Sequence, residues 1–290
     1  MKRMFTQIFV IVSVSLLFLA LPRAGGAATV EFKFFGGHNF MGGGDLNAGL
    51  KGQFDMNKAM AAGYGIISQG DYNAFHGGME LGGDLIIHFS PFVGIGFGVS
   101  YLRAQSSSEV TFTFPDISTA MTIKPQVTAT PIRAGLYFSI PMGSPVSLSL
   151  NGGAEYYLAN IKLSSKYTYP SGWSQSEVDV DSKGKFGLFA GIGLEIKIHR
   201  NLSFFLEGRG RYARIDGFKG SETDTSSSGS PDSSTGELWY AKVNFDSIGQ
   251  FPSVFLSETQ PSTGPMYQDV RSARLEFNGF SALAGLMLRF

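Results

Sequence analysis

The last twelve residues, 279–290, constrain the fold more strongly than any other part of the chain. Residues of one parity there are all apolar: Phe280, Ala282, Ala284, Leu286, Leu288 and Phe290. The other parity includes Ser281, Gly285 and Arg289. Alternate residues of a β-strand face opposite sides of the sheet, and a strand of roughly 33 Å tilted by about 40° matches the roughly 25 Å apolar band of an outer-membrane barrel. The pattern predicts the closing strand of a transmembrane β-barrel, although a sandwich strand packed on a protein core would alternate in the same way.

The N-terminal residues have the pattern of a secretory signal peptide. Lys2 and Arg3 precede an apolar run over residues 8–21, and small residues follow at 24–28. Such a segment is cleaved during export and takes no part in the mature fold. The run is too short for a good membrane-spanning helix. No cysteine follows it, which excludes a lipid anchor. We therefore expect residues 1–28 to be removed and residues 29–290 to form the mature protein.

Composition narrows the class of protein. The rest of the chain has no second long apolar segment, which argues against a helical inner-membrane protein. The 23 basic and 23 acidic residues balance, so nucleic acid is not an expected partner. The 38 glycines and 26 phenylalanines suit a barrel in which small residues face a crowded interior and aromatic rings face lipid. The composition is therefore typical of an exported membrane barrel.

Seven further segments alternate as the last one does. Together the eight segments are residues 29–35, 77–89, 93–101, 130–140, 146–158, 186–198, 202–215 and 279–290. Three connections are short turns, at 90–92, 141–145 and 199–201, and four are long loops, at about 36–76, 104–126, 164–184 and 217–273. Alternating short periplasmic turns and long extracellular loops are typical of outer-membrane barrels. We therefore predict an all-β fold, a transmembrane antiparallel up-and-down β-barrel of eight strands.

Two of the predicted loops have some internal pattern. Asp45–Lys51 could form a short helical turn within the first loop. In the last loop, residues 239–245 alternate, which suits either a hairpin outside the barrel or an extra pair of membrane strands making ten. The returning segment, 251–256, is too short to span a membrane and contains Pro252, so eight strands are favoured.

Aromatic residues recur at two heights of the predicted barrel. The predicted girdles are Phe89, Phe138, Phe204 and Phe290 near the short turns, and Tyr101, Tyr156, Phe186, Tyr212 and Phe280 at the other end. Aromatic girdles mark the two membrane interfaces of such barrels. A water-soluble lipocalin-like barrel would alternate in the same way with its faces reversed. The girdles, the long loops on one side and the terminal phenylalanine favour the membrane version.

The chain resembles the small bacterial outer-membrane barrels of the OmpA, OmpX and OmpW kind. The motif that carries the resemblance is the C-terminal assembly signal, which Gly285, Leu288 and Phe290 match, whereas Leu283 stands where a polar residue is usual. The resemblance implies insertion into the Gram-negative outer membrane by the barrel-assembly machinery, among outer-membrane lipid and lipopolysaccharide. Likeness to OmpW would imply a narrow porin-like channel for small or hydrophobic solutes.

The inward parity of the strands carries six acids and six bases. This predicted lumen network consists of Glu31, Lys33, Glu80, Asp84, Arg133, Glu155, Glu195, Lys197, Glu207, Arg209, Arg211 and Arg289. An eight-stranded barrel is narrow enough for side chains to fill, and buried charges need partners. We therefore expect a mostly closed, salt-bridged lumen. A narrow selective pore lined by Arg209 and Arg211 is the alternative.

Catalytic and metal sites are not expected. His88 and Ser90 share a face, but at the short-turn end, and His38, His76 and Asp71 lie near the predicted loops. A lipid hydrolase or protease is therefore a remote alternative, and no cofactor is implied. The sequence predicts a non-enzymatic outer-membrane protein that acts in envelope structure or contacts an unidentified extracellular partner through its loops.

Overall fold

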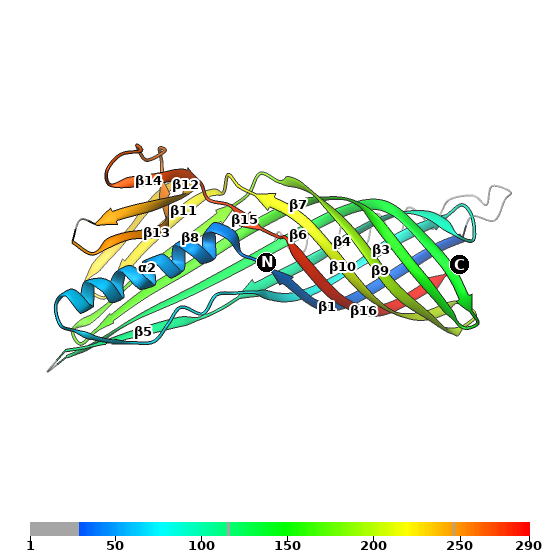
Figure 1. Ribbon diagram of the computed structural model, residues 1–290, viewed down its shortest axis with the longest axis horizontal. Coiled ribbons are helices and arrows are strands. Elements are labelled where there is room, and N and C mark those ends of the chain that lie inside the picture. Colours follow the sequence, from blue (N-terminus) through cyan, green and yellow to red (C-terminus); the bar gives the residue numbers. More distant parts are fainter. Residues whose placement is uncertain (1–28, 115–116, 246) are drawn as a thin grey trace.

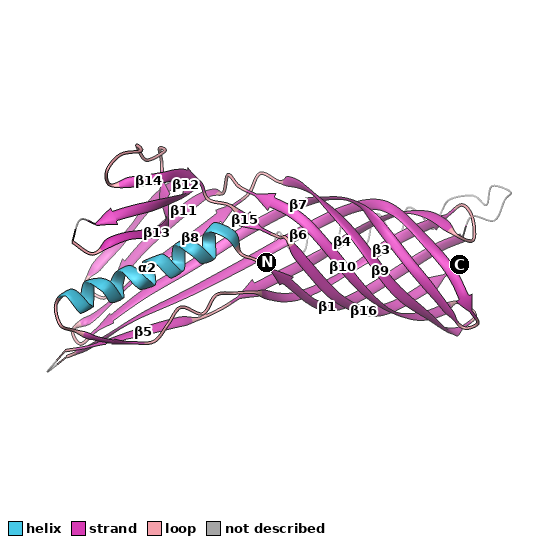
Figure 2. Ribbon diagram, viewed as in Figure 1, coloured by secondary structure: helices cyan, strands magenta, loops and turns pink. Residues whose placement is uncertain are grey.

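The computed structural model describes residues 29–114, 117–245 and 247–290. The predicted signal peptide, 1–28, lies outside these residues. Their secondary structure consists of one helix and sixteen strands, shown in Figures 1 and 2. The bounds are β1 Thr29–Met41, α2 Gly44–Gly63, β2 Ile67–Gln69, β3 Gly77–His88, β4 Val93–Gln105, β5 Ser108–Thr113, β6 Ser118–Gly143, β7 Val146–Tyr169, β8 Gly172–Asp181, β9 Lys185–His199, β10 Leu202–Ile215, β11 Lys219–Ser226, β12 Gly229–Phe245, β13 Gly249–Ser257, β14 Tyr267–Ser272, β15 Leu275–Glu276 and β16 Gly279–Arg289.

Eight of the strands form an antiparallel ring. Following the pairings from β1 through β3, β4, β6, β7, β9, β10 and β16 leads back to β1. Phe34 of β1, for example, pairs with Gly83 of β3 on one side and with Leu286 of β16 on the other. Each predicted segment overlaps one strand of this ring, so the predicted antiparallel barrel is confirmed. The total number of strands exceeds eight because the connections form further strands.

The faces of the ring follow the predicted alternation. In β9, Leu188 and Ile192 point outward and are more than half exposed, whereas Phe189 between them is only 4% exposed. In β16, Ser281 is buried beside the exposed Phe280. The outer face of the ring is therefore apolar and its inner face is the packed side.

Beyond the ring, the same sheet continues into a second region, which we call the extension and define as residues 42–76, 105–129, 159–184 and 216–278. Strands β6 and β7 have 26 and 24 residues, far more than the roughly 9–11 that a membrane needs. Their far ends belong to a curled sheet with the order β13-β12-β11-β8-β7-β6-β5-β2. Helix α2 packs against both edge strands, β13 and β2, and Figure 1 shows it running along the extension beside β13.

The extension corrects the prediction of four long loops. Residues 36–76 contain the end of β1, a helix of 20 residues and β2, where only a helical turn over Asp45–Lys51 was expected. The ranges 104–126, 164–184 and 217–273 also contain strands. Residues 239–245 belong to β12, which pairs with β13 and β14 in the extension and not with the ring.

Local sequence explains how α2 begins and packs. Gly43 and Gly44 have φ values of 71° and 55°, which suit glycine at the entry to the helix. Leu46, Leu50 and Phe54 recur every four residues and bury one face. A Cβ on Gly52 would lie 1.9 Å from the carbonyl oxygen of Pro252 in β13, so glycine there permits close packing. Among the described residues, no helix has the length and apolar character that crossing a bilayer requires.

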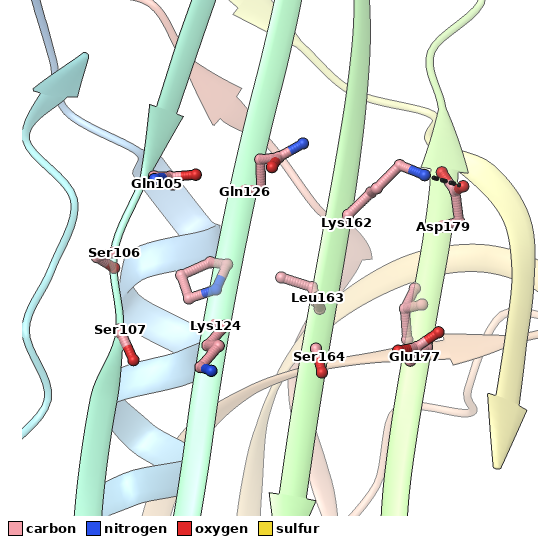
Figure 3. Close-up of a pocket in the computed structure, with 12 residues that line it drawn as sticks. Gln105, Ser106, Ser107, Lys124, Gln126, Lys162, Leu163, Ser164, Glu177 and Asp179 are labelled. Atoms are coloured by element: carbon pink, nitrogen blue, oxygen red, sulfur yellow. Dashed lines mark hydrogen bonds and ion pairs between the residues drawn. The ribbon is translucent and has the colours of Figure 1, made fainter. Parts of the chain in front are cut away.

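The outer face of β6, β7 and β8 in the extension is polar. A groove of about 540 Å³ crosses it near the end of β4, and Figure 3 shows the side chains that line this groove. Lys162 and Asp179 face each other there, with Nζ 2.7 Å from the carboxylate. Lys124 and Glu177 are also exposed along it. This face is therefore suited to water, unlike the outer face of the ring.

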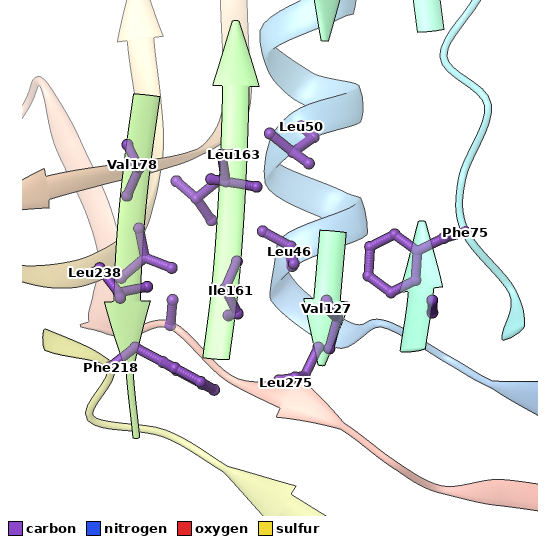
Figure 4. Packing of buried hydrophobic residues seen from close by; sticks show 14 of the residues in the cluster. Leu46, Leu50, Phe75, Val127, Ile161, Leu163, Val178, Phe218, Leu238 and Leu275 are labelled. Carbon is purple, nitrogen blue, oxygen red and sulfur yellow. The ribbon is translucent and has the colours of Figure 1, made fainter. Parts of the chain in front are cut away.

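The main hydrophobic core lies inside the extension. Figure 4 shows side chains from α2 meeting those from the sheet. The labelled members are Leu46, Leu50, Phe75, Val127, Ile161, Leu163, Val178, Phe218, Leu238 and Leu275. Many core residues come from the four ranges predicted as loops, which explains why these ranges are ordered. A smaller inner cluster of Phe35, Phe205, Leu283 and Met287 lies in the ring.

Candidate functional site: buried charges inside the ring

The ring encloses the predicted charges. Ten of the twelve are buried, in a region formed by β1, β3, β6, β7, β9 and β10. The side chain of Arg289 is 41% exposed but contacts two buried acids. Lys197 is exposed near the end of β9, so it is not part of the buried set. We call the other eleven residues the lumen network.

The central layer of the lumen network links strands that are not neighbours in the ring. Arg133 on β6 donates through Nε to Asp84 on β3 at 2.7 Å, although β4 separates the two strands. Arg209 on β10 donates to Glu207 on the same strand at 2.8 Å and lies 3.4 Å from Asp84. Lys33 on β1 also bonds Glu207. Apart from the pair within β10, these contacts skip one or two strands and so connect parts of the wall that share no backbone hydrogen bonds.

The next layer lies toward the extension. Arg211 donates to both oxygens of Glu80, at 2.8 and 2.5 Å, and β16 and β1 lie between their strands in the ring. Arg211 and Arg133 each lie 3.4 Å from Glu155. Tyr157 donates its hydroxyl to Glu155 at 2.5 Å, and the same side chain belongs to the hydrophobic core. The network therefore ends where the apolar core begins.

A third group lies toward the short turns. Arg289 donates to Glu31 at 2.9 and 2.5 Å and lies 3.5 Å from Glu195. The Nε2 atom of His88 lies 3.3 Å from Glu31. Because the Arg289 side chain is partly exposed, this group forms the solvent-facing end of the network.

Charge is balanced in the two inner layers. Four bases and four acids meet there: Lys33, Arg133, Arg209, Arg211, Glu80, Asp84, Glu155 and Glu207. Removing one partner of a buried pair typically costs about 3–5 kcal/mol, because the other charge stays buried. A guanidinium does not lose its proton in proteins, so the arginines hold the acids in charged pairs. This arrangement fills space and ties together strands that are not neighbours in the ring.

Several partners of these charges were not predicted. Ser203 donates to Glu195 at 2.7 Å, and Ser281 donates to Glu80 at 2.8 Å. Their inward parity was visible in the sequence, but which acid each hydroxyl meets depends on the register between strands. Tyr157 has the same parity as Glu155, but it was missed because the predicted network included charged residues alone.

Aromatic rings also line the charges. The Phe35 ring lies 5.1 Å from the Arg133 guanidinium and 5.0 Å from that of Arg209. The Phe205 ring lies 4.2 Å from Nζ of Lys33. Both phenylalanines are the second of a Phe–Phe pair, so one ring of each pair must point inward. That doublet is the sequence signal that could have identified them.

The histidines are dispersed. His88 faces Glu31, whereas the hydroxyl of Ser90 accepts hydrogen bonds from backbone amides of its own turn. His38 and His76 are exposed. Within the part of the chain that the structure describes, no group of three or more histidine, cysteine or acidic residues could hold a metal ion.

The predicted girdle residues lie on the outer surface of the ring. Seven of the nine are exposed: Phe89, Tyr101, Phe138, Phe186, Tyr212, Phe280 and Phe290. Tyr156 and Phe204 are partly buried, and the Tyr156 ring lies 5.1 Å from that of Phe186. Their placement at the membrane interfaces stays a prediction.

The predicted assembly signal forms part of the seam with β1. A Cβ on Gly285 would lie 1.9 Å from the carbonyl oxygen of Phe34, and Leu288 pairs with Phe32. Phe290 exchanges two backbone hydrogen bonds with Val30, of 2.8 and 3.1 Å. Recognition of these residues by the assembly machinery stays a prediction.

Comparison with known proteins agrees with an antiparallel barrel. The family model described as outer membrane protein beta-barrel domain matches residues 22–235. Because this is more than half of the chain, the protein belongs to that family. It is thus a bacterial outer-membrane β-barrel protein, and its surroundings are membrane lipid. No curated protein matches the chain.

Three solved structures show weak similarity. Outer membrane protein OprG of Pseudomonas aeruginosa is 10% identical with a TM-score of 0.41, covering 91% of this chain and 97% of that one. Ail, the attachment invasion locus protein of Yersinia pestis, is 13% identical with a TM-score of 0.32, covering 91% and 98%. Outer membrane protease OmpT of Escherichia coli is 10% identical with a TM-score of 0.27, covering 93% and 99%. At these scores the similarities do not bear on function.

Proposed function

We propose that this protein is a non-conducting, non-enzymatic outer-membrane barrel whose role is to carry the extension on the cell surface, in envelope structure or surface contact. The observation that supports this most directly is the lumen network, in which buried ion pairs link strands of the ring that are not neighbours in the sheet. Arg133, Arg209 and Arg211 are each at most 5% exposed within it.

Ion pairs inside the ring, followed along the barrel by the apolar core of the extension, support a closed lumen. Ion pairs occupy the ring up to Glu155, and the hydroxyl of Tyr157 connects them to the apolar core of the extension. A permeating ion would have to displace buried pairs and then cross apolar side chains. Each of those steps costs several kcal/mol.

The connections support display on the outer surface. The three tight turns of the ring lie at the end opposite to the extension, as Figure 1 shows around the C-terminus. Short turns face the periplasm in outer-membrane barrels, so the extension projects away from the cell. A folded region of this size, joined to the barrel by continuous strands, is suited to presenting a surface.

Single-channel recording on the refolded chain in planar bilayers tests the proposal. We expect no steady conductance from the wild type. The double variant Asp84→Ala/Arg133→Ala removes one buried ion pair of the network and leaves its charge balanced. The double variant Lys162→Ala/Asp179→Ala, which removes an exposed ion pair, is the control. Folding of each protein is checked by the different gel mobility of boiled and unboiled samples. Steady, large wild-type conductance would contradict the proposal.

The same preparation addresses the alternative of a narrow channel for small or hydrophobic solutes. That function predicts solute uptake into proteoliposomes and its loss when leucine or phenylalanine residues toward the extension are replaced. Uptake equal to that of empty liposomes would count against a channel and for the proposal.

A further inference from the structure

The far end of the extension carries exposed apolar side chains on three adjacent turns. They are Tyr64, Ile67, Phe114, Ile117, Tyr169 and Trp173. Their exposed fractions run from 36% for Phe114 and Trp173 to 84% for Tyr64. We call these six residues the apolar tip. Soluble surfaces rarely gather large apolar side chains in this way without a partner.

Strand pairing brings the three turns together. Ile67 of β2 pairs with Thr113 of β5, which directly precedes Phe114. Strand β6 leaves that turn and pairs with β7, up to Thr168, which directly precedes Tyr169. The apolar tip is therefore one end of a continuous sheet, together with the segment that follows α2.

The apolar tip lies far from the membrane-spanning ring. Figure 1 shows the β5–β6 hairpin and the end of α2 at the opposite end of the molecule from the C-terminus. Leu158 is the last outward apolar residue of β7 within the predicted membrane band, and Tyr169 follows eleven residues later. That separation corresponds to roughly 36 Å of extended strand. The tip therefore cannot contact the bilayer in which its own barrel sits.

The tip is nearly neutral. Among the described residues of its turns, 64–70, 112–114, 117–120 and 166–174, the one charged side chain is Lys166, whose Nζ lies 5.3 Å from the Trp173 ring. The sequence adds one acid to these turns, Asp116, outside the described residues. Serine, threonine and glycine separate the apolar residues. The tip thus presents separate apolar projections with almost no net charge.

We propose that the apolar tip docks onto a second, opposing lipid bilayer and inserts its side chains among zwitterionic headgroups. Tryptophan and tyrosine favour the membrane interface because their rings are apolar and their ends are polar. Turns that each project one or two side chains suit insertion between lipids, whereas a stable protein interface needs a contiguous area of about 800 Å² per partner. A neutral tip gains little from anionic lipid, so zwitterionic lipid suffices. This inference rests on the proposed function, because it requires the extension to face outward.

Tryptophan fluorescence tests the docking directly. The chain has two tryptophans, so the variant Trp239→Phe leaves Trp173 as the one reporter. This variant is placed in a nanodisc of phosphatidylcholine without bromine. The nanodiscs are then mixed with separate vesicles of brominated phosphatidylcholine. We expect quenching and a blue shift of Trp173 emission. Binding in 50 mM and 500 mM salt should be similar.

A matched pair of variants keeps the test specific. Tyr64→Ser/Ile67→Ser should weaken vesicle binding about tenfold or more, since each buried ring or aliphatic chain contributes through its area. Met266→Ser, at an exposed apolar residue away from the tip, should bind as the parent does. Unchanged binding of the double variant, unquenched Trp173, or capture of a purified protein without vesicle binding would overturn the proposal. Conductance is measured separately, so a conducting barrel would refute the proposed function and leave the docking result to stand on its own.

Discussion

The ring and the extension share strands, but the apolar face of these strands differs between the two regions. It points outward in the ring and inward in the extension. In β7, Leu158 points outward from the ring, while Glu155 points into it. A few residues later Ile161 and Leu163 point inward to the core, and Lys162 points outward. The strand does not change its pleat, so the apolar side of the sequence changes parity. That change marks where lipid gives way to water outside and where charge gives way to core inside.

The comparison shows that the medium outside each region determines which kind of side chain can fill its interior. Lipid covers the apolar outer face of the ring, so the ring can place charges inside. Water covers the outer face of the extension, so its interior must bury apolar side chains. Removing a charged side chain should therefore destabilise the protein strongly where the side chain points into the ring and only weakly where it points outward from the extension.

The largest effect is expected from breaking a buried pair of the lumen network. Arg211→Ala leaves Glu80 without its main partner and removes one of the two arginines beside Glu155, and we expect a loss of about 3–5 kcal/mol in the free energy of unfolding. The measurement is a urea titration of the folded fraction on gels of unboiled samples. Lys162→Ala breaks an exposed pair in the extension and should cost less than about 1 kcal/mol. Equal losses would contradict the contrast.

A smaller but comparable loss is expected from the core of the extension. Leu50 on α2 is 1% exposed, and Leu50→Ala should cost about 2–5 kcal/mol. The loss should be local: limited proteolysis should cut near α2 while the barrel keeps its gel mobility. Lys51→Ala, on the exposed side of the same helix, is the control. Cleavage within the ring strands instead would show that the two regions unfold as one.

Close packing of α2 gives a third test. Gly52→Ala places a methyl group against the Pro252 carbonyl and should cost about 1–3 kcal/mol through strain. At Gly63 a Cβ would meet nothing within 4 Å, so Gly63→Ala should be neutral or slightly stabilising. Thermal unfolding of the extension, followed by protease sensitivity, distinguishes the two. Similar behaviour would indicate that β13 does not hold the helix.

The smallest effect concerns acid. The Arg271 guanidinium hydrogen-bonds Asp269 and holds the pKa of that carboxyl below its usual range. A lowered pKa stabilises the fold above the unfolded value of about 3.9 and loses that contribution as pH falls through the folded value. Because Asp269 is exposed, its contribution to the free energy of unfolding is about 0.3 kcal/mol at most. The free energies of unfolding of wild type and Asp269→Asn should converge as the pH falls below the lowered pKa of the folded state. A difference that grows with acid would contradict this expectation.

Much of the ring was predictable because its signal is local. Residues such as Leu188, Phe189 and Ile192 alternate with the period of a strand, and membrane on one side requires a sustained apolar face. The inward charges were also visible, Lys197 being the exception because it lies near the strand end, where water reaches both faces. Their pairing was not predictable, since Arg211 meets Glu80 from strands 131 positions apart in the chain.

Most of the extension, apart from the hairpin considered at residues 239–245, was not predicted, and for a different reason. Its strands were not predicted because apolar residues such as Ile161 and Leu163 occupy the parity opposite to that of the membrane band, so the alternation that indicates a lipid-facing strand stops at Leu158. That shift of parity was itself a usable signal. Helix α2 had a weaker sequence signal, because its glycines lower helix propensity, and Gly49 and Gly52 are explained only by the close approach of β13.

The sequence by itself determined the antiparallel barrel, the faces of its strands and the charged character of the interior, since these depend on alternation and on a uniform lipid environment. The tertiary structure decided the partner of each charge and the folding of the predicted loops into the extension. It also placed the three turns of the apolar tip side by side. Those features depend on register and on contacts between distant segments, which local alternation does not encode.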